Sequence, residues 1–212
     1  MLSLLTFVCL YCYTLSLSAS PNPTLENSAR IYSIKQDSMG FIWLSGHDGL
    51  LRYDGESVTK FSAKSPNWSI PYVWSHSIEH DKDKFIVATE STGSWIFDPN
   101  NGKSEPIKFT TPQDSHYQTI KFNGYYYTYS LNNVYEYNPQ TQQTRSIMST
   151  DGVYELATTN THLYVNGKKN GVYSFNDDKL SQFYSGNVKK IIAVDNHLVV
   201  LTKSHLITFS GT

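Results

Sequence analysis

The chain has 212 residues, of which 17% are charged and 14% aromatic, and its formal net charge at pH 7 is −1. A chain of this length can bury one substantial core, and its low charged fraction is offset by Ser, Thr, Asn and Gln residues, which suit solvated strands and turns. The near-neutral balance lacks the basic footprint of nucleic-acid-binding proteins, so we expect no nucleic-acid partner.

The N-terminal segment has the pattern of an export signal. Residues 1–17 are largely apolar and are followed by small residues at 18–20, although no Lys or Arg precedes the apolar run. We therefore expect residues 1–19 to be a cleaved signal peptide. An uncleaved membrane anchor and a buried core segment are the alternatives, and the anchor is weakened because Ser and Thr interrupt the apolar run.

Both cysteines, Cys9 and Cys12, lie inside this segment. Their C-x-x-C spacing indicates a redox pair in other contexts. No strand or helix turn surrounds them here, so we interpret them as apolar filler, and residues 20–212 then form a mature chain without thiols. Because no G-x-S-x-G, Walker or dinucleotide fingerprint is present either, we expect no cofactor.

From Ile31 onward the sequence repeats a unit of short apolar runs that are separated by turn residues. In the first copy the runs cover 31–36, 41–44, 50–53 and 57–61. Four further copies begin with comparable runs at 75–80, 118–122, 155–159 and 190–194. No long stretch has the apolar period of a helix. A unit of this kind cannot bury its own apolar face, so it must stack against its neighbours.

Four strands in a repeated unit are typical of a β-propeller blade. We therefore predict an all-β protein with four complete four-stranded blades and a partial fifth, as part of a larger propeller. Asn123-Gly124 is the residue pair that a two-residue hairpin needs, because both positions require positive φ. The expected equivalent positions in the five first runs are Ile34, Ile78, Ile120, Leu156 and Ile192.

The fifth copy ends after its third run, which leaves two ways to complete the ring. Either residues 24–30 supply the missing outer strand and close a five-bladed propeller, or the chain is the front part of a longer ring. Residues 21–30 contain two prolines and only two apolar side chains, Leu25 and Ala29, which is poor material for a strand. We therefore favour a propeller that is truncated at its C-terminal side.

The first copy also carries a specific motif. Asp37, Gly40 and Trp43 are spaced as D-x-x-G-x-x-W, and residues 46–54 read G-x-x-G-L-x-R-Y-D. This sequence resembles the two-component-regulator propeller repeat. We expect Asp37 to accept hydrogen bonds from backbone amides in its turn and Gly40 to provide the positive φ that this turn needs. Trp43 should fill the space between blades, and Gly49 should let the second turn close.

The resemblance is specific only in the first copy, where Ser45 and His47 depart from the small residues that are commoner in the family. In that family the propeller forms the periplasmic sensing region of bacterial membrane receptors. An immunoglobulin-like linker, a membrane span and a histidine kinase or diguanylate cyclase usually follow. The resemblance thus implies a periplasmic location, a homodimer formed through a downstream domain, and membrane attachment only through an anchor or a downstream region.

Residues His76 to His80 read H-x-x-E-H, a zinc motif when it lies on a helix. The repeat places them on the first strand of the second copy instead. Residues four apart on a strand are separated by about 13 Å and cannot hold one metal ion. We therefore expect no metal site and interpret these residues as a solvated strand.

The loops after the second and fourth strands of a blade open on the same face of a propeller. In this chain those loops carry a set of polar and aromatic side chains, namely His47, Trp68, Tyr72, Trp74 and Glu90. Aromatic rings beside polar groups are the usual means of gripping a saccharide or another small polar ligand. The alternative is that these aromatic residues only pack between the first two blades.

Taken with the resemblance, these patterns favour an exported ligand- or signal-sensing propeller of a bacterial transmembrane receptor. We expect this portion to be non-catalytic, with a kinase or cyclase domain following in a longer chain. An exported propeller lyase or hydrolase that acts on polysaccharide is the alternative, and a non-functional gene fragment is a third possibility. An enzyme should concentrate His, Arg, Glu or Tyr on its inner strands, and only the run at 75–80 is rich in such residues.

Overall fold

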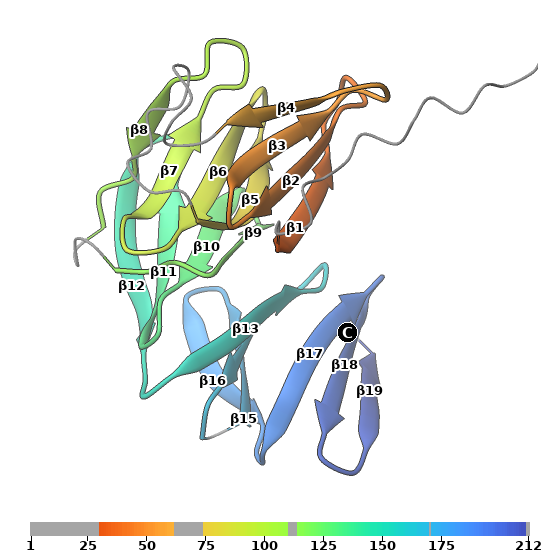
Figure 1. Ribbon diagram of the computed structural model, residues 1–212. Helices are drawn as coiled ribbons and strands as arrows, with labels where there is room; N and C mark the ends of the chain where they lie inside the picture. Colours follow the sequence, from red (N-terminus) through yellow and green to blue (C-terminus); the bar gives the residue numbers. More distant parts are fainter. Residues whose placement is uncertain (1–29, 62–73, 110–113, 170, 211–212) are drawn as a thin grey trace, which may run out of the picture.

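The computed structural model describes residues 30–61, 74–109, 114–169 and 171–210. Every regular element in these ranges is a β-strand, and the strands form five antiparallel sheets (Figure 1). Four sheets have four strands and the last has three, and within each sheet the strands pair in chain order. The prediction of an all-β propeller with four complete blades and a partial fifth is confirmed.

Several predictions concern residues outside these ranges and stay predictions. They are the signal peptide at 1–19 with its two cysteines, the candidate closing strand that begins at residue 24, and the loop aromatics Trp68 and Tyr72. Within the described ranges no helix is long and apolar enough to cross a membrane.

The strands of each blade run in order from the propeller axis outward. Blade one contains β1 (Ile31–Gln36), β2 (Ile42–Gly46), β3 (Gly49–Tyr53) and β4 (Val58–Phe61). Blade two contains β5 (Ser75–Asp81), β6 (Lys84–Thr89), β7 (Gly93–Phe97) and β8 (Ser104–Pro106). Blade three contains β9 (Gln118–Phe122), β10 (Tyr125–Tyr129), β11 (Asn133–Asn138) and β12 (Gln143–Ser149).

Blade four contains β13 (Val153–Thr158), β14 (Leu163–Gly167), β15 (Gly171–Asn176) and β16 (Lys179–Tyr184). Blade five contains β17 (Val188–Val194), β18 (His197–Thr202) and β19 (Leu206–Ser210). The inner strands are therefore β1, β5, β9, β13 and β17. The last two of these begin two residues before the predicted runs, and the first three begin where the sequence places them.

The tight turns between inner strands and their neighbours follow the sequence. Asn123 and Gly124 have φ of 48° and 82°, so both positions adopt the positive φ that the hairpin requires. In blade two, Asp81 pairs with Lys84, and Lys82 between them has φ of 58°. This segment is therefore a tight hairpin turn.

The first hairpin has a longer turn than the later ones. The turn Asp37–Phe41 connects β1 to β2, so that Lys35 pairs with Trp43. Ile34 lies on the opposite face of the sheet and is 64% exposed. Ile34 pairs with Leu44 as Ile78 pairs with Val87, so the expected equivalence of Ile34 with Ile78 is confirmed. Ile78 is buried against blade one, whereas among the described residues no blade covers the corresponding face of blade one, which leaves Ile34 exposed.

The expected positions in blades three and five, Ile120 and Ile192, are wrong by one residue. In blade three the equivalent of Leu156 is Thr119, because the backbone N–H of each donates to a side chain of the preceding inner strand. Ile191 pairs with Val200 as Leu156 pairs with Val165, and Ile191 is 2% exposed. Ile192 lies on the other face of the sheet and is 47% exposed. Ile191, and not Ile192, is therefore the equivalent of Leu156, since the side chains of a strand alternate between its two faces.

Asp37 organises the long first turn through its carboxylate. Its Oδ1 accepts hydrogen bonds of 2.9 Å from the backbone N–H groups of Met39 and Phe41, and its Oδ2 accepts one of 2.8 Å from Trp43 Nε1. Gly40 adopts φ of 91° within the turn. The turn and the indole ring that enters the interface are thus fixed by the same side chain.

Each blade buries one face against the next blade. Trp43 is completely buried between blades one and two, with its ring 4.8 Å from the ring of Phe85. Gly49 opens the strand that follows, with φ of 90°. The cluster at this interface comprises Trp43, Leu50, Phe61, Ile78, Phe85, Val87 and Phe97. Separate apolar clusters fill the later interfaces, as expected of a repeat protein whose units contact mainly their neighbours.

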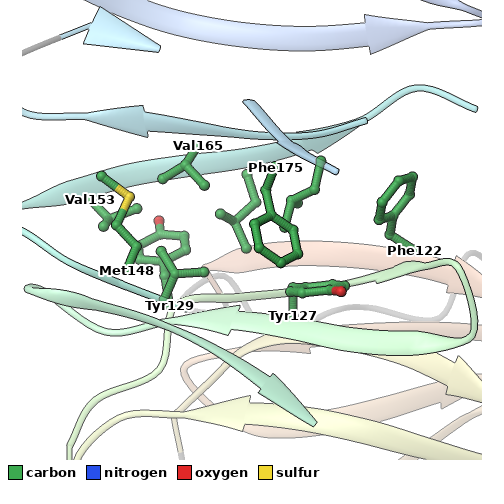
Figure 2. Close-up of a cluster of buried hydrophobic side chains, with 10 residues drawn as sticks. Phe122, Tyr127, Tyr129, Met148, Val153, Val165 and Phe175 are labelled. Carbon is green, nitrogen blue, oxygen red and sulfur yellow. The ribbon is translucent and has the colours of Figure 1, made fainter. Parts of the chain in front are cut away.

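The interface between blades three and four is the largest of these clusters (Figure 2). Tyr127 of β10 faces Phe175 of β15 at 5.9 Å in an edge-to-face arrangement, which is the favoured geometry for aromatic pairs. The hydroxyl of Tyr127 donates to Glu136, which also accepts two hydrogen bonds from Arg145 at 2.7 and 2.8 Å. Arg145 also pairs with Asp178 of blade four, so an ion network joins the two blades at the rim.

The five blades form an open arc, and the sheets do not close into a ring (Figure 1). The inner strands contact one another in succession from β1 to β17. Blade five leaves one apolar face uncovered, with Val194 54% and Leu206 68% exposed. An uncovered face at the end of the arc is consistent with a partial propeller.

Candidate functional site

A cavity of about 380 Å³ lies along the propeller axis, between the inner strands of blades one to four. The inner strands begin at one end of this cavity, which we call the upper face. The loops between the second and third strands of the blades lie at the same end. The cavity lining includes Tyr32, Lys35, His76, Glu79, Tyr117 and Glu155. Most of these side chains are polar or aromatic, because the apolar side chains of the inner strands face the interfaces between blades.

A run of rings leads from the upper face into the cavity. Trp74 and His47 are stacked with centroids 4.3 Å apart and planes within 3°. Tyr32 lies 5.4 Å from His47 and 5.2 Å from His76, and His76 lies 5.1 Å from Tyr117. The run therefore connects segments of blades one, two and three that are far apart in sequence. It presents ring faces and edges along one side of the cavity.

Glu90 is tied into the same arrangement. Its carboxylate lies 3.2 Å from His76 Nε2, and its backbone N–H donates to the carbonyl of Trp74 at 3.2 Å. Burial lowers the pKa of His76, Glu90 opposes that shift, and His47 adds to it. A neutral His76 with its Nε2–H donated to Glu90 leaves Nδ1 as a hydrogen-bond acceptor for a ligand.

The charges inside the cavity are largely paired. Lys35 Nζ lies 3.0 Å from Glu79 Oε2, which links blade one to blade two. Glu155 Oε2 accepts a hydrogen bond of 2.8 Å from the N–H of Ile191 in blade five. Burial raises the pKa of Glu155, while the Ile191 N–H and Lys190 oppose the shift.

Neutral side chains make similar links between the other inner strands. Ser77 Oγ accepts a hydrogen bond of 2.8 Å from the N–H of Thr119. Gln118 bonds both backbone groups of Leu156, with Oε1 accepting at 2.8 Å and Nε2 donating at 3.0 Å. Every pair of adjacent inner strands is thus joined by a side chain that lines the cavity, so a molecule bound there would contact the links between blades.

The structure brings together three of the five predicted site residues. His47, Trp74 and Glu90 meet at the upper face, whereas Trp68 and Tyr72 lie outside the described residues. Sequence reasoning did not single out Tyr32 and Tyr117, which extend the site into the cavity. Their position at the start of an inner strand, beside polar residues, was the signal that could have found them.

The interpretation of residues 76–80 as a solvated strand is wrong for His76. These residues form β5 as predicted, but the side chain of His76 is only 12% exposed and faces the cavity. His80 instead contacts the carbonyl of Gln36 at 2.8 Å, at the other end of the strand. Among the described residues no group of three or more His, Cys, Asp or Glu side chains is placed to hold a metal ion.

A second histidine, His116, is buried away from the cavity. Its Nδ1 lies 2.8 Å from Ser94 Oγ, and both residues are almost completely buried. Burial lowers the pKa of His116 to about 4, with Asp114 opposing the shift. A Ser–His contact of this kind can activate a nucleophile, but a substrate cannot reach this buried pair. The imidazole ring of His116 packs against the rings of Phe109 and Tyr135.

Comparison with known proteins supports the fold. No family model matches the chain, and no curated protein matches its sequence. The extracellular domain of the putative one component system BT4673 from B. thetaiotaomicron matches with a TM-score of 0.72 and 19% identity, covering 89% of this chain and 28% of that one. The extracellular domain of the putative hybrid two component system BT3049 from the same organism matches with a TM-score of 0.67 and 15% identity, covering 85% and 28%.

Virginiamycin B lyase from Staphylococcus aureus is also similar, with a TM-score of 0.68 and 10% identity, covering 89% of this chain and 72% of that one. At these identities the similarities show a shared fold. The chain spans 28% of the length of the two B. thetaiotaomicron structures. These neighbours are consistent with the two-component-regulator propeller family, whose repeat the first blade resembles.

Proposed function

We propose that this chain is a ligand-sensing propeller module of an exported bacterial signalling receptor and that it is not itself catalytic. The observation that carries the proposal is the axial cavity, which combines exposed ring faces with polar groups and joins four inner strands. The extracellular domains of the one component and hybrid two component systems share its fold. The proposal includes a periplasmic location, a cleaved signal peptide, and a kinase or cyclase domain that follows in a longer chain.

The proposed ligand is a saccharide or another small polar molecule that enters from the upper face. It would stack on the rings of Tyr32 and Tyr117 and accept or donate hydrogen bonds at His76 and Glu90. Because the cavity is lined by the links between inner strands, ligand binding would alter how adjacent blades pack. That change would reach the output domain through a downstream region, where the receptor forms its homodimer.

An exported lyase or hydrolase is the second candidate. Two observations favour it: titratable side chains face the cavity, and a lyase shares the fold. Against it, Lys35 and Glu79, which face the cavity from blades one and two, are held together as an ion pair. A general acid or base needs a free proton or lone pair directed at the reacting atom.

The experiment that tests the proposal is calorimetric titration of the protein with a panel of soluble oligosaccharides, followed by mass spectrometry of each incubated sugar. We expect binding with no change in the sugar. Tyr117→Ala should weaken the binding, whereas Tyr53→Ala on the outer part of blade one should not. Cleaved or unsaturated products would favour the enzyme, and no binding across the panel would contradict the saccharide ligand.

A further inference from the structure

The upper face has an uneven distribution of charge. On the side of blades one and two the cavity rim carries the carboxylates Asp48 and Glu90, and each lies beside a cationic or imidazole group. On the side of blades four and five it carries the exposed residues Lys168, Lys169, Lys189 and Lys190. Lys169 pairs with Asp151. Within the described ranges neither Lys189 nor Lys190 forms an ion pair with a carboxylate.

A second cavity, of about 580 Å³, lies beside these lysines. It is lined by Asn187, Lys189 and Lys190 of blade five, and it shares Tyr154 and Glu155 with the axial cavity. The ring of Tyr154 is half exposed at this junction. The two cavities therefore meet at Tyr154 and Glu155, with ring faces at one end and two ammonium groups at the other.

The positive and negative charges that line the two adjoining cavities do not cancel. In the axial cavity Lys35 is paired with Glu79, and the half-buried Glu155 interacts electrostatically with Lys190. One carboxylate stands against two ammonium groups at the junction, so the blade-five end carries excess positive charge. A negatively charged ligand group would be favoured there, because the lysines can donate charge-assisted hydrogen bonds to it.

We propose that the site selects an acidic saccharide, one that carries a carboxylate or sulfate group. Its sugar rings lie along Tyr32, His76 and Tyr117, and its anionic group lies between Lys189 and Lys190. This inference rests on the proposed sensing function and deepens it by naming the class of ligand. The carboxylate of Glu155 limits the affinity for the anion, because it lies at the junction of the two cavities.

The test is calorimetric titration of the protein with three tetrasaccharides of similar length: cellotetraose, tetragalacturonic acid and a chondroitin sulfate tetrasaccharide. We expect at least one acidic probe to bind more tightly than cellotetraose, and its affinity to fall with added salt. The two acidic probes distinguish a carboxylate-selective from a sulfate-selective site. Equal affinity for all three probes would overturn the inference and leave the sensing function standing, whereas no binding by any probe would contradict both.

Variants locate the effect. The double variant K189Q/K190Q should lower the affinity for the preferred acidic probe by about tenfold at low salt and leave cellotetraose unaffected. The matched variant K103Q/K179Q removes the same charge from a turn of blade two and the outer strand of blade four, and it should change neither affinity. Glu155→Gln, which keeps an oxygen for the Ile191 N–H, should raise the affinity for the acidic probe several-fold.

Two further outcomes would overturn the inference. One is equal loss of acidic binding in both double lysine variants, which would indicate an effect of net charge rather than a site. The other is comparable binding of a single-stranded oligonucleotide with the same number of charges, which would indicate non-specific attraction of polyanions to the lysines.

Discussion

The covered interfaces between blades and the uncovered face of blade five are built from the same alternating strands, yet they differ in what completes them. Between blades one and two, Trp43 is fully buried and held by Asp37. On the uncovered face of blade five, Leu206 of β19 and Val194 of β17 are apolar side chains of the same kind of strand and remain exposed. Alternation is therefore enough to form a blade, whereas stability depends on what packs against it.

The largest expected effect lies in the covered interface. Trp43→Ala should lower the free energy of unfolding by about 3–5 kcal/mol, because it removes a large buried ring and leaves a cavity beside Phe61 and Phe85. Denaturant unfolding followed by circular dichroism measures it. The control is His47→Ala at the upper face, which should lower the free energy of unfolding by under about 0.5 kcal/mol. Equal losses of stability in the two variants would contradict the assignment of Trp43 to the core and of His47 to the surface.

The next effect is a dependence on pH at the interface of blades two and three. The pKa of His116 falls from its usual 6.5 to about 4 on folding, since burial disfavours the charged ring. Below pH 6.5 the unfolded chain therefore binds a proton that the folded protein does not. The contribution of His116 is complete above pH 6.5 and is lost as the pH falls toward 4, by about 3 kcal/mol in all.

His116→Gln isolates this effect. Unfolding free energies measured at several pH values should depend less on pH between 6.5 and 4 in this variant than in the unmodified protein. The matched change His205→Gln, on an exposed loop of blade five, should leave the pH profile as it is. A profile that is equally steep in all three proteins would show that His116 is not responsible.

How far the sequence could predict this molecule is clearest in blade one. The alternation of apolar residues and the turn pairs located its strands, and the D-x-x-G-x-x-W spacing anticipated that Asp37 binds turn amides and that Trp43 lies between blades. The alternation also identified Ile34 as the equivalent of Ile78, but it could not report that Ile34 is exposed, because burial of that face depends on a neighbouring blade.

The candidate site was only partly predictable for a different reason. His47, Trp74 and Glu90 could be placed on one face from the order of strands and loops alone. Tyr32, His76 and Tyr117 converge only because three inner strands surround one axis, and no local pattern reports which of their faces points inward. The ligand that we propose depends on that convergence, so it could not follow from the sequence.

The contribution of the turn itself is smaller than that of the ring it holds. Asp37→Asn keeps the shape of the side chain but replaces one acceptor oxygen by a donor that faces the N–H groups of Met39 and Phe41 or Trp43. We expect a loss of about 1–3 kcal/mol in the free energy of unfolding. Asp83→Asn makes the same chemical change in the shorter turn of blade two, at an exposed side chain, and should have little effect. Equal effects would mean that the three hydrogen bonds of Asp37 add nothing.

Binding at the upper face should respond more weakly still. Trp74→Ala removes the ring that stacks on His47, and aromatic contacts of this kind contribute roughly 0.5–1.5 kcal/mol beyond burial. Saccharide affinity, measured by calorimetry, should therefore fall several-fold without loss of the fold, and Trp74→Phe should restore most of it. Unfolding of the Ala variant would instead show that Trp74 is part of the core. Trp68→Ala should behave in the same way if that residue lies on this face.

The smallest effect on stability is expected at the uncovered face of blade five. Leu206→Lys replaces a side chain that is 68% exposed, so the free energy of unfolding should change by less than about 0.5 kcal/mol. Leu198→Ala in the same sheet is its counterpart, because Leu198 is fully buried toward blade four and its loss should lower the free energy of unfolding by about 2–5 kcal/mol. An exposed apolar sheet face also promotes association between copies, so Leu206→Lys should reduce the aggregated fraction in sedimentation velocity. If Leu206→Lys were as destabilising as Leu198→Ala, that face would be covered in solution, and the contrast between covered and uncovered faces would hold only for the isolated arc of five blades.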